Sequence, residues 1–214
     1  MDKNKIAVAV FNKMAQVYQD KFMDVNLYDD TFDFFCKAIT SKNAEVLELA
    51  CGPGNITQHL LKKRPDFRIL GTDLAPNMIA LARINNPGIP FEVMDCREID
   101  KIDRTFNGIM CGFCLPYLAK KETIKLINDA FMLLKPGGVL YLSTMEDDYT
   151  KSEFKKGSGG DEIFMHFYRA DDLISISEER GFKILNLDRK EYPAADGTVV
   201  VDLVLIAGKQ DEHL

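Results

Sequence analysis

Residues Val46 to Asn55 read V-L-E-L-A-C-G-P-G-N, a short apolar run that leads directly into a glycine-rich turn. The run predicts a buried strand, and the residues after it predict a helix that begins at Asn55. Glycines let the backbone come close to a ligand, and the amide groups at the start of a helix point toward it. This strand, turn and helix therefore predict a site for a nucleotide-like ligand.

Two further apolar runs end in acidic residues. Arg68–Leu74 carries Asp73 near its tip, and Pro90–Asp95 ends in Asp95. An acid at the end of the second strand of such a unit is placed to accept hydrogen bonds from ribose hydroxyls, which is the role expected for Asp73. Asp95 is expected to accept a hydrogen bond from an exocyclic amine such as that of adenine. The alternatives are that Asp73 caps the following helix and that Asp95 is a loop acid.

Strands and helices alternate through most of the chain. This alternation predicts an α/β fold with a doubly wound, mostly parallel sheet and helices on both faces. Two long apolar runs joined by Pro193–Gly197, a turn that contains Asp-Gly, predict an antiparallel hairpin at one edge. The expected strands are Glu45–Cys51, Arg68–Leu74, Pro90–Asp95, Phe106–Gly112, Val139–Met145, Phe182–Tyr192 and Thr198–Gly208, and the expected helices are Asn55–Arg64, Pro76–Ile84, Lys121–Leu134 and Ala170–Arg180.

The chain is expected to form a single domain over residues 1–214. Residues 1–43 predict an N-terminal helical cap, because apolar side chains recur there at helical spacing. Residues 146–168 interrupt the alternation with a polar, glycine-containing stretch and are expected to be a flexible insertion, a lid or a disordered loop. The apolar residues of the two predicted cap helices are Val10, Phe11, Met14, Val17 and Tyr18, and Phe32, Phe34, Phe35 and Ile39.

The composition is typical of a globular protein, with 46% hydrophobic residues and a formal net charge of −6. The acidic balance disfavours nucleic-acid binding, which needs clustered Lys and Arg side chains. No apolar run approaches the ~20 residues of a membrane helix, and no signal peptide is visible. The five cysteines predict reduced, buried thiols, because Cys111-x-x-Cys114 has no second pair of metal ligands. We expect a cytoplasmic monomer or homodimer without a bound metal or a membrane partner.

Four motifs, in this order, resemble those of class I S-adenosylmethionine-dependent methyltransferases of the small-molecule type. They are V-L-E-L-A-C-G-P-G-N, L-G-T-D-L-A-P-N-M-I, F-E-V-M-D-C and L-L-K-P-G-G-V-L-Y-L-S, and they lie between Ala44 and Thr144. The resemblance implies a Rossmann-like, seven-stranded sheet whose last strand is antiparallel, in agreement with the expected edge hairpin. It also implies S-adenosyl-L-methionine as the cofactor.

The same resemblance implies the residues of the cofactor site. Glu48 would order the glycine turn, Asp73 would bind both ribose hydroxyls, and Tyr18 would cap the methionine end of the cofactor, with a core aromatic as the alternative for Tyr18. Ala50 stands where these enzymes often have a glycine. The expected residues are Tyr18, Glu48, Ala50, Cys51, Gly52, Gly54, Asn55 and Cys111 around the turn and the methionine part, and Asp73, Leu74, Met78, Asp95 and Cys96 around the ribose and adenine.

The methyl acceptor has weaker signals in the sequence. His166, in I-F-M-H-F-Y, is the candidate base or acceptor-orienting group, and the alternative is a histidine packed among its aromatic neighbours. Phe113, Tyr117 and Tyr168 are expected to contact the acceptor. The Asn/Asp-Pro-Pro-Tyr motif of enzymes that methylate planar amino groups is only half present, because Cys114 stands at its first position.

The expected function is methyl transfer to a small-molecule acceptor, in which the enzyme aligns a nucleophile with the S–CH3 bond. The alternatives are a protein or RNA acceptor, and a non-catalytic module that binds the cofactor. A nicotinamide-dependent oxidoreductase is a further alternative, which the missing third glycine of G-x-G-x-x-G disfavours.

Overall fold

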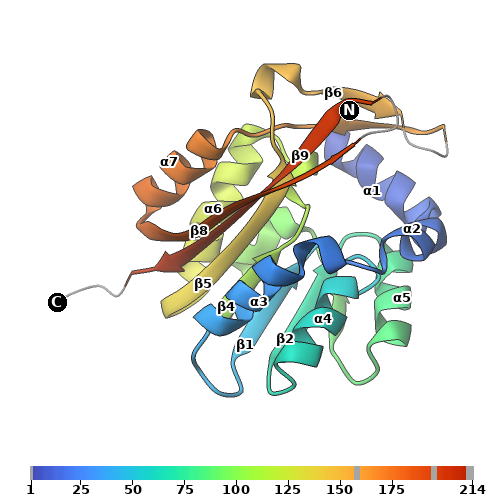
Figure 1. Cartoon of the computed structure of the whole chain (residues 1–214). Coiled ribbons are helices and arrows are strands. Elements are labelled where there is room, and N and C mark those ends of the chain that lie inside the picture. Colours follow the sequence, from blue (N-terminus) through green and yellow to red (C-terminus); the bar gives the residue numbers. More distant parts are fainter. Residues whose placement is uncertain (1, 157–159, 194–196, 211–214) are drawn as a thin grey trace.

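Seven strands form the central sheet (Figure 1): β1 (Glu45–Leu49), β2 (Arg68–Asp73), β3 (Phe91–Val93), β4 (Phe106–Cys111), β5 (Leu134–Met145), β8 (Phe182–Pro193) and β9 (Val199–Lys209). The computed structural model describes residues 2–156, 160–193 and 197–210. The strand order is β3-β2-β1-β4-β5-β9-β8. Strands β1 to β5 are parallel, and β9 is antiparallel to both of its neighbours. The predicted fold class is therefore confirmed.

The strand order reverses at β1, which lies between β2 and β4. In an open α/β sheet a ligand binds outside the carboxyl ends of the strands at such a reversal. Because β9 is antiparallel, its first residues reach this same edge of the sheet. The register pairs Asp202 of β9 with Met145 at the end of β5. The sheet thus brings residues from both ends of the chain to one edge.

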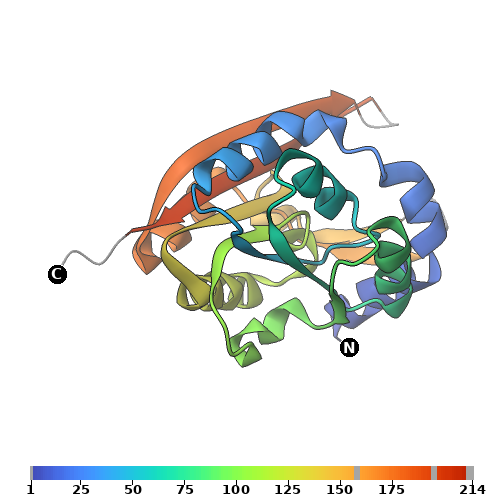
Figure 2. The ribbon, with the colours of Figure 1, turned by 90° about the horizontal axis from the view of Figure 1, so that it is seen from below.

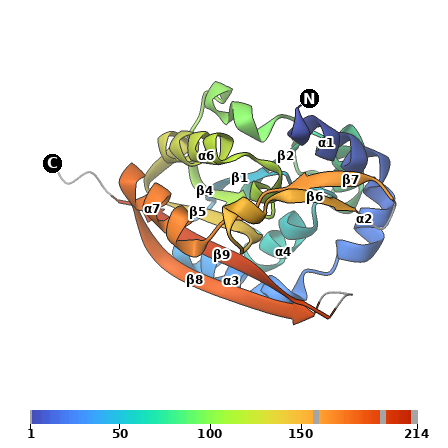
Figure 3. The same ribbon diagram turned by 90° about the horizontal axis from the view of Figure 1, so that it is seen from above.

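Helices cover both faces of the sheet, because each buries an apolar stripe against it. On one face lie α3 (Asp29–Ala38) and α4 (Asn55–Lys63), and on the other lie α6 (Lys120–Leu133) and α7 (Ala170–Arg180), as Figures 2 and 3 show. Helix α5 (Pro76–Asn85) contacts β2 and β3. Within the described ranges, no helix combines the length and the apolar character that crossing a membrane requires.

Two N-terminal helices and a separate hairpin cover the carboxyl edge of the sheet (Figure 3). The helices are α1 (Lys3–Lys13) and α2 (Ala15–Phe22), and the antiparallel hairpin consists of β6 (Glu153–Lys156) and β7 (Glu162–Met165). Helix α1 packs against both α5 and β7. A ligand at the carboxyl edge would therefore lie under these elements.

Three details differ from the sequence predictions. Residues 1–43 contain three α-helices where two are expected, because the first of them ends at Lys13 and another begins at Ala15. Strand β5 begins directly after α6, since Leu134 pairs with Phe106 ahead of an irregularity in the register. The insertion contains the β6–β7 hairpin instead of loop throughout. Residues 194–196 of the predicted turn lie outside the described residues, but the antiparallel pairing of β8 with β9 is confirmed.

Candidate functional site

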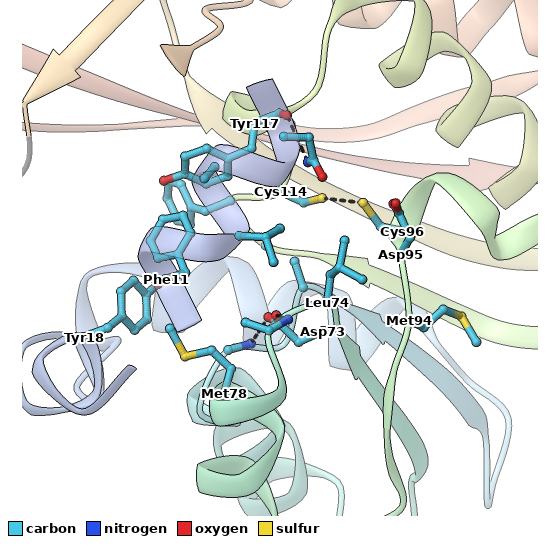
Figure 4. A pocket seen from close by; sticks show the side chains of 18 residues that line it. Phe11, Tyr18, Asp73, Leu74, Met78, Met94, Asp95, Cys96, Cys114 and Tyr117 are labelled. Carbon is cyan, nitrogen blue, oxygen red and sulfur yellow. Dashed lines mark hydrogen bonds between the residues drawn. The ribbon is translucent and has the colours of Figure 1, made fainter. Parts of the chain in front are cut away.

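A cavity, termed the first cavity, lies where β1, β2, β3 and β4 end at the carboxyl edge of the sheet (Figure 4). The N-terminal helices form one side of it, and the loops that follow the strands form the other. Its lining residues are Asn4, Ala7, Val8, Phe11 and Tyr18 from the helices, and Ala50, Gly52, Asp73, Leu74, Ala75, Met78, Met94, Asp95, Cys96, Gly112, Phe113, Cys114 and Tyr117 from the strand ends and the segments after them.

Asp73 is the last residue of β2, and it lines the first cavity. Its Oδ2 accepts a hydrogen bond from the amide of Gly52 (2.9 Å), and its Oδ1 accepts one from the amide of Ala75 (2.8 Å). Burial raises the pKa of Asp73, and these backbone amides oppose the rise. Each carboxylate oxygen has more than one lone pair, so Asp73 can also accept hydrogen bonds from a ligand.

Glu48 lies within β1, behind the glycine turn, and does not line the first cavity. Its Oε2 accepts a hydrogen bond from the hydroxyl of Thr57 in α4, while its Oε1 has no hydrogen-bond partner within the described residues. Burial raises the pKa of Glu48 to about 8, and the charge of Asp73 acts in the same direction. Glu48 therefore joins the strand to the helix on the two sides of the turn.

The raised pKa of Glu48 predicts a stability that falls as the pH rises. The folded state keeps the proton up to a pKa of about 8, whereas the unfolded state releases it near the ordinary value of 4.5. Between these values the folded state binds more protons, so the free energy of unfolding decreases with pH. We expect the wild type to lose up to about 4 kcal/mol more between about pH 5 and pH 8 than Glu48→Gln does. Urea unfolding of both proteins at the two pH values measures this difference, and equal losses would contradict it.

Alternate residues of the turn after β1 have positive φ angles: Ala50 (51°), Gly52 (53°) and Gly54 (79°). A Cβ atom at Gly52 would lie 3.7 Å from Cε1 of Tyr18, so the glycine leaves bare backbone on the cavity wall. Gly54 instead faces α5, and its carbonyl accepts a hydrogen bond from Asn86 Nδ2 (3.0 Å). Two of the three residues in this series line the cavity, and Gly54 sets the packing of the turn against α5.

At the end of β3, Asp95 and Cys96 both line the first cavity, as does Met94. The carboxylate of Asp95 accepts hydrogen bonds from the guanidinium of Arg97, with Nη2 at 2.7 Å from Oδ2. Although burial acts against it, this guanidinium holds the pKa of Asp95 below its usual value. The thiols of Cys96 and Cys114 lie 3.3 Å apart (Figure 4). Arg97 also forms ion pairs with Asp2 and Glu122, so Asp95 shares this one guanidinium with two other carboxylates.

Three aromatic side chains enclose the cavity on the side of the N-terminal helices. Phe11 of α1 packs edge-on against Tyr18 of α2 and against Tyr117, with ring centroids 5.8 Å and 5.0 Å apart. Burial, together with the charge of Asp73, raises the pKa of Tyr18 to about 12, so its hydroxyl stays protonated at neutral pH. The N-terminal segment therefore supplies a neutral, aromatic wall.

A second cavity adjoins the first and lies toward α2, α3 and β9. The two cavities share the wall formed by Phe11, Tyr18, Ala50, Gly52, Gly112, Phe113 and Tyr117. The second cavity is also lined by Val10, Met14, Val17, Lys21, Phe22, Asp24, Val25, Tyr28, Phe32, Cys51, Asn55, Ile56, Met145, Asp161, Ile163, Tyr192 and Asp202. The two cavities are thus neighbours, and the seven residues of the shared wall face both of them.

The structure places His166 and Tyr168 away from both cavities, and this corrects the roles expected for them. His166 is 6% exposed, and its ring stacks on Tyr149 and contacts Phe164. Burial and the charge of Lys3 lower the pKa of His166. Tyr168 is 1% exposed, and its hydroxyl donates to the carbonyl of Leu118 (2.5 Å). Both side chains are packed in the protein interior, and neither lines one of the two cavities.

Five of the predicted cofactor residues do not line the first cavity: Glu48, described above, and Cys51, Gly54, Asn55 and Cys111. Cys51 and Asn55 line the second cavity instead, whereas Cys111 and Gly54 line neither. Cys111 is buried in the core of the sheet, and the lining of the first cavity begins one residue later, at Gly112. The sequence analysis missed the contribution of α1, although the helical spacing of its apolar residues was a signal. The missed residues of the first cavity are Asn4, Ala7, Val8, Phe11, Ala75, Met94, Gly112 and Cys114.

Residues 46–138 match the protein family described as "Methyltransferase domain". Over this segment, which is less than half of its length, the chain is similar to methyltransferase domains. A curated relative, YqeM of Bacillus subtilis (strain 168), is 28% identical over 188 residues, which are 83% of this chain and 74% of YqeM. The alternative of a nicotinamide-dependent oxidoreductase is therefore wrong.

Other relatives of this methyltransferase act on different acceptors. The trans-aconitate 2-methyltransferase of Variovorax paradoxus is 36% identical over 97 residues, which are 45% of this chain and 37% of the relative. The tRNA N(3)-methylcytidine methyltransferase of Schizosaccharomyces pombe is 22% identical over 189 residues, 78% of this chain and 76% of the relative. The structure of the 1,6-didemethyltoxoflavin-N1-methyltransferase of Burkholderia thailandensis, which holds 1,6-didemethyltoxoflavin and S-adenosylhomocysteine, has the same fold. Its TM-score is 0.70 at 19% identity, over 97% of this chain and 88% of that one.

Among the described residues, no group of three or more His, Cys, Asp or Glu side chains is arranged to hold a metal ion. Cys111 and Cys114 are free and buried, like Cys36, Cys51 and Cys96. The lining of the first cavity combines backbone, carboxylate, thiol and aromatic groups with apolar side chains such as Leu74 and Met78.

Proposed function

We propose that the first cavity binds S-adenosyl-L-methionine and that the second cavity binds a small-molecule methyl acceptor. The residues shared by the two linings support this proposal, because ligands in the two neighbouring cavities would lie close together there. When bound, the cofactor supplies an electrophilic methyl group. The protein has to place a nucleophile in line with that group, and such positioning is worth effective molarities of about 10⁵–10⁸ M.

The residues of the first cavity fit this cofactor. Asp73 has lone pairs left for two ribose hydroxyls, and the apolar side chains of Leu74 and Met78 suit the adenine ring. Gly52 leaves room for the methionine part close to the backbone, and Tyr18 closes that end. Because Asp95 is already paired with Arg97, the segment around Cys96 would contact the edge of the adenine ring.

The second cavity supports a small acceptor. Its walls come from α1, α2, α3, the strand ends and the hairpin residue Ile163, and it opens to solvent beside the exposed Val17 and Phe22, so a small acceptor could enter it. The net charge of −6 argues against the alternative of an RNA acceptor, since RNA binding needs basic surfaces. The five free, buried cysteines support a cytoplasmic location.

Two measurements test this function. Calorimetry with S-adenosylhomocysteine should detect binding to the purified protein. No heat of binding at millimolar ligand would contradict the proposal that the first cavity binds the cofactor. Incubation of metabolite extracts and of total RNA with S-adenosylmethionine labelled on its methyl group should transfer the label to a small molecule. Label in the RNA or protein fraction alone would overturn the small-molecule acceptor. Label in no fraction, despite cofactor binding, would favour a non-catalytic binding module.

The position of His166 leads to a further expected result. Because His166 packs between Tyr149 and Phe164 and lines neither cavity, His166→Gln should leave the affinity for S-adenosylhomocysteine within about twofold of the wild type. It should lower the free energy of unfolding by roughly 1–2 kcal/mol, through the loss of ring packing. Calorimetry and urea unfolding measure the two quantities. If His166→Gln had normal stability but a large loss of affinity for S-adenosylhomocysteine, His166 would have to contribute to the binding site.

A further inference from the structure

The second cavity contains a buried carboxylate that the proposed methyl transfer does not use. Asp202 of β9 lines this cavity although its residue is only 1% exposed. Its Oδ2 accepts a hydrogen bond from the hydroxyl of Tyr28 (2.5 Å). Within the part of the chain that the structure describes, its Oδ1 has one long contact of 3.5 Å, with the hydroxyl of Tyr192, so this oxygen can accept a hydrogen bond from a stronger donor.

No lysine, arginine or histidine of the described ranges forms an ion pair with Asp202. Lys190, its neighbour across the β8–β9 pairing, is paired with Asp30 and Asp188 instead. Burial of a carboxylate without a cationic partner is unfavourable, and it raises the pKa of Asp202. A positively charged ligand would remove this cost.

The other charges that line the second cavity nearly balance one another. Asp161 forms an ion pair with Lys13 (2.9 Å). Asp24 lies at an exposed position and is matched in number by Lys21, the one basic residue in the lining of this cavity as described. The negative charge that is left is that of Asp202. The interior of the cavity therefore favours a cation and disfavours an anion.

Aromatic rings line the same cavity as this carboxylate, and Tyr28 and Tyr192 contact it. Tyr28 packs edge-on against Phe113 of the shared wall, with ring centroids 5.2 Å apart, and it also contacts Phe32. Further aromatic lining comes from Phe22 and Tyr192. The faces of such rings attract cations, and the rings bury apolar groups of a ligand at the same time. Carboxylate and rings together suit a positively charged nitrogen on an apolar body.

We propose that the methyl acceptor carries an ammonium group on an apolar or aromatic body, and that Asp202, with Tyr28 and Tyr192, binds this ammonium group. Because a protonated nitrogen has no lone pair, the ammonium group positions the acceptor. A different atom of the acceptor, with a lone pair, takes the methyl group as the S–CH3 bond breaks to leave S-adenosylhomocysteine, and any proton on that atom passes to solvent. This inference rests on the proposed function, because it names the substrate class of the second cavity. Asp202 acts here as a binding residue that sets specificity. Anionic acceptors, such as carboxylic acids, would be excluded by the same charge.

Matched small probes test this charge preference. Tyramine and 3-(4-hydroxyphenyl)propionate have similar bodies and opposite charges, and tryptamine with 3-(indol-3-yl)propionate forms a second such pair. Each is titrated by calorimetry into the protein saturated with S-adenosylhomocysteine. We expect at least one amine to bind at least about tenfold more tightly than its matched carboxylate. The proposal is overturned if neither amine binds at millimolar concentration, or if the carboxylates bind as well as the amines.

The variant Asp202→Asn should abolish the preference. It keeps an acceptor for the hydroxyl of Tyr28 and should weaken amine binding about tenfold, with no loss for the carboxylates. Asp103→Asn, which removes an exposed carboxylate that lines neither cavity, is the matched control and should keep the wild-type preference. An unchanged preference in Asp202→Asn would contradict the proposal, and if this variant does not fold, the wild-type comparison decides alone. Failure to bind S-adenosylhomocysteine would contradict the proposed function itself, whereas intact binding without amine selectivity would contradict only this inference.

Discussion

Asp73→Ala is expected to weaken the binding of S-adenosylhomocysteine by at least about 100-fold. Two hydroxyl hydrogen bonds to a carboxylate contribute about 1.5–3 kcal/mol each, and about 1.4 kcal/mol corresponds to a factor of ten. The substitution also removes the acceptor for the amides of Gly52 and Ala75, which holds the turn after β1 against the start of α5. The cavity would therefore lose both a ligand contact and its local order.

Calorimetry measures this loss, and circular dichroism shows whether the variant is folded. Asp73→Asn should fall between the wild type and Asp73→Ala, because the amide oxygen still accepts a hydrogen bond but carries no charge. Asp103→Ala, at an exposed position away from the cavities, is the control and should bind as the wild type does. A folded Asp73→Ala protein whose affinity stays within about threefold of the wild type would refute the ribose-binding role of Asp73.

Gly54→Ala should destabilise the protein by about 2–3 kcal/mol. The φ angle of Gly54 is 79°, and a left-handed conformation costs a residue with a side chain roughly 1–2 kcal/mol. An added Cβ would lie 2.4 Å from Nδ2 of Asn86 and 3.4 Å from Ala82. Asn86 would have to move, and its hydrogen bond to the Gly54 carbonyl, worth about 1 kcal/mol, would be lost.

Gly88→Ala separates these two costs. Gly88 has a similar φ angle of 86°, but no heavy atom lies within 4 Å of a Cβ built there. Its substitution should therefore cost only the conformational part, roughly 1–2 kcal/mol. Urea unfolding of both variants measures the difference. Equal destabilisation would mean that the contact of the turn with α5 contributes nothing.

The strands could be predicted well from the sequence, because the apolar runs from Glu45 to Met145 are short and each ends at a turn or a glycine. The acids at strand ends were equally informative, since the parallel arrangement brings Asp73 and Asp95 to one edge. The hairpin of β6 and β7 was missed because Glu153 to Met165 is a polar stretch with glycines. Its strands pair with each other and not with the central sheet.

The acceptor side could not be predicted, because its residues are distant in sequence. Tyr28 and Asp202 meet only when α3 packs beside β9, and no local pattern indicates that contact. His166 stood out as a histidine in a suggestive segment, yet its aromatic neighbours are the packing that buries it. Tyr168 was misjudged for the same reason. A residue type shows what chemistry is possible, and tertiary packing decides whether the side chain reaches the ligand.

A crystal structure of the complex with S-adenosylhomocysteine tests the central claim most directly, since the account depends on two cavities that meet at one wall. We predict that the ribose hydroxyls lie on Asp73 and that the sulfur faces the second cavity between Tyr18, Gly52 and Phe113. A sulfur that points away from the second cavity, or an adenosyl group bound elsewhere, would contradict the account.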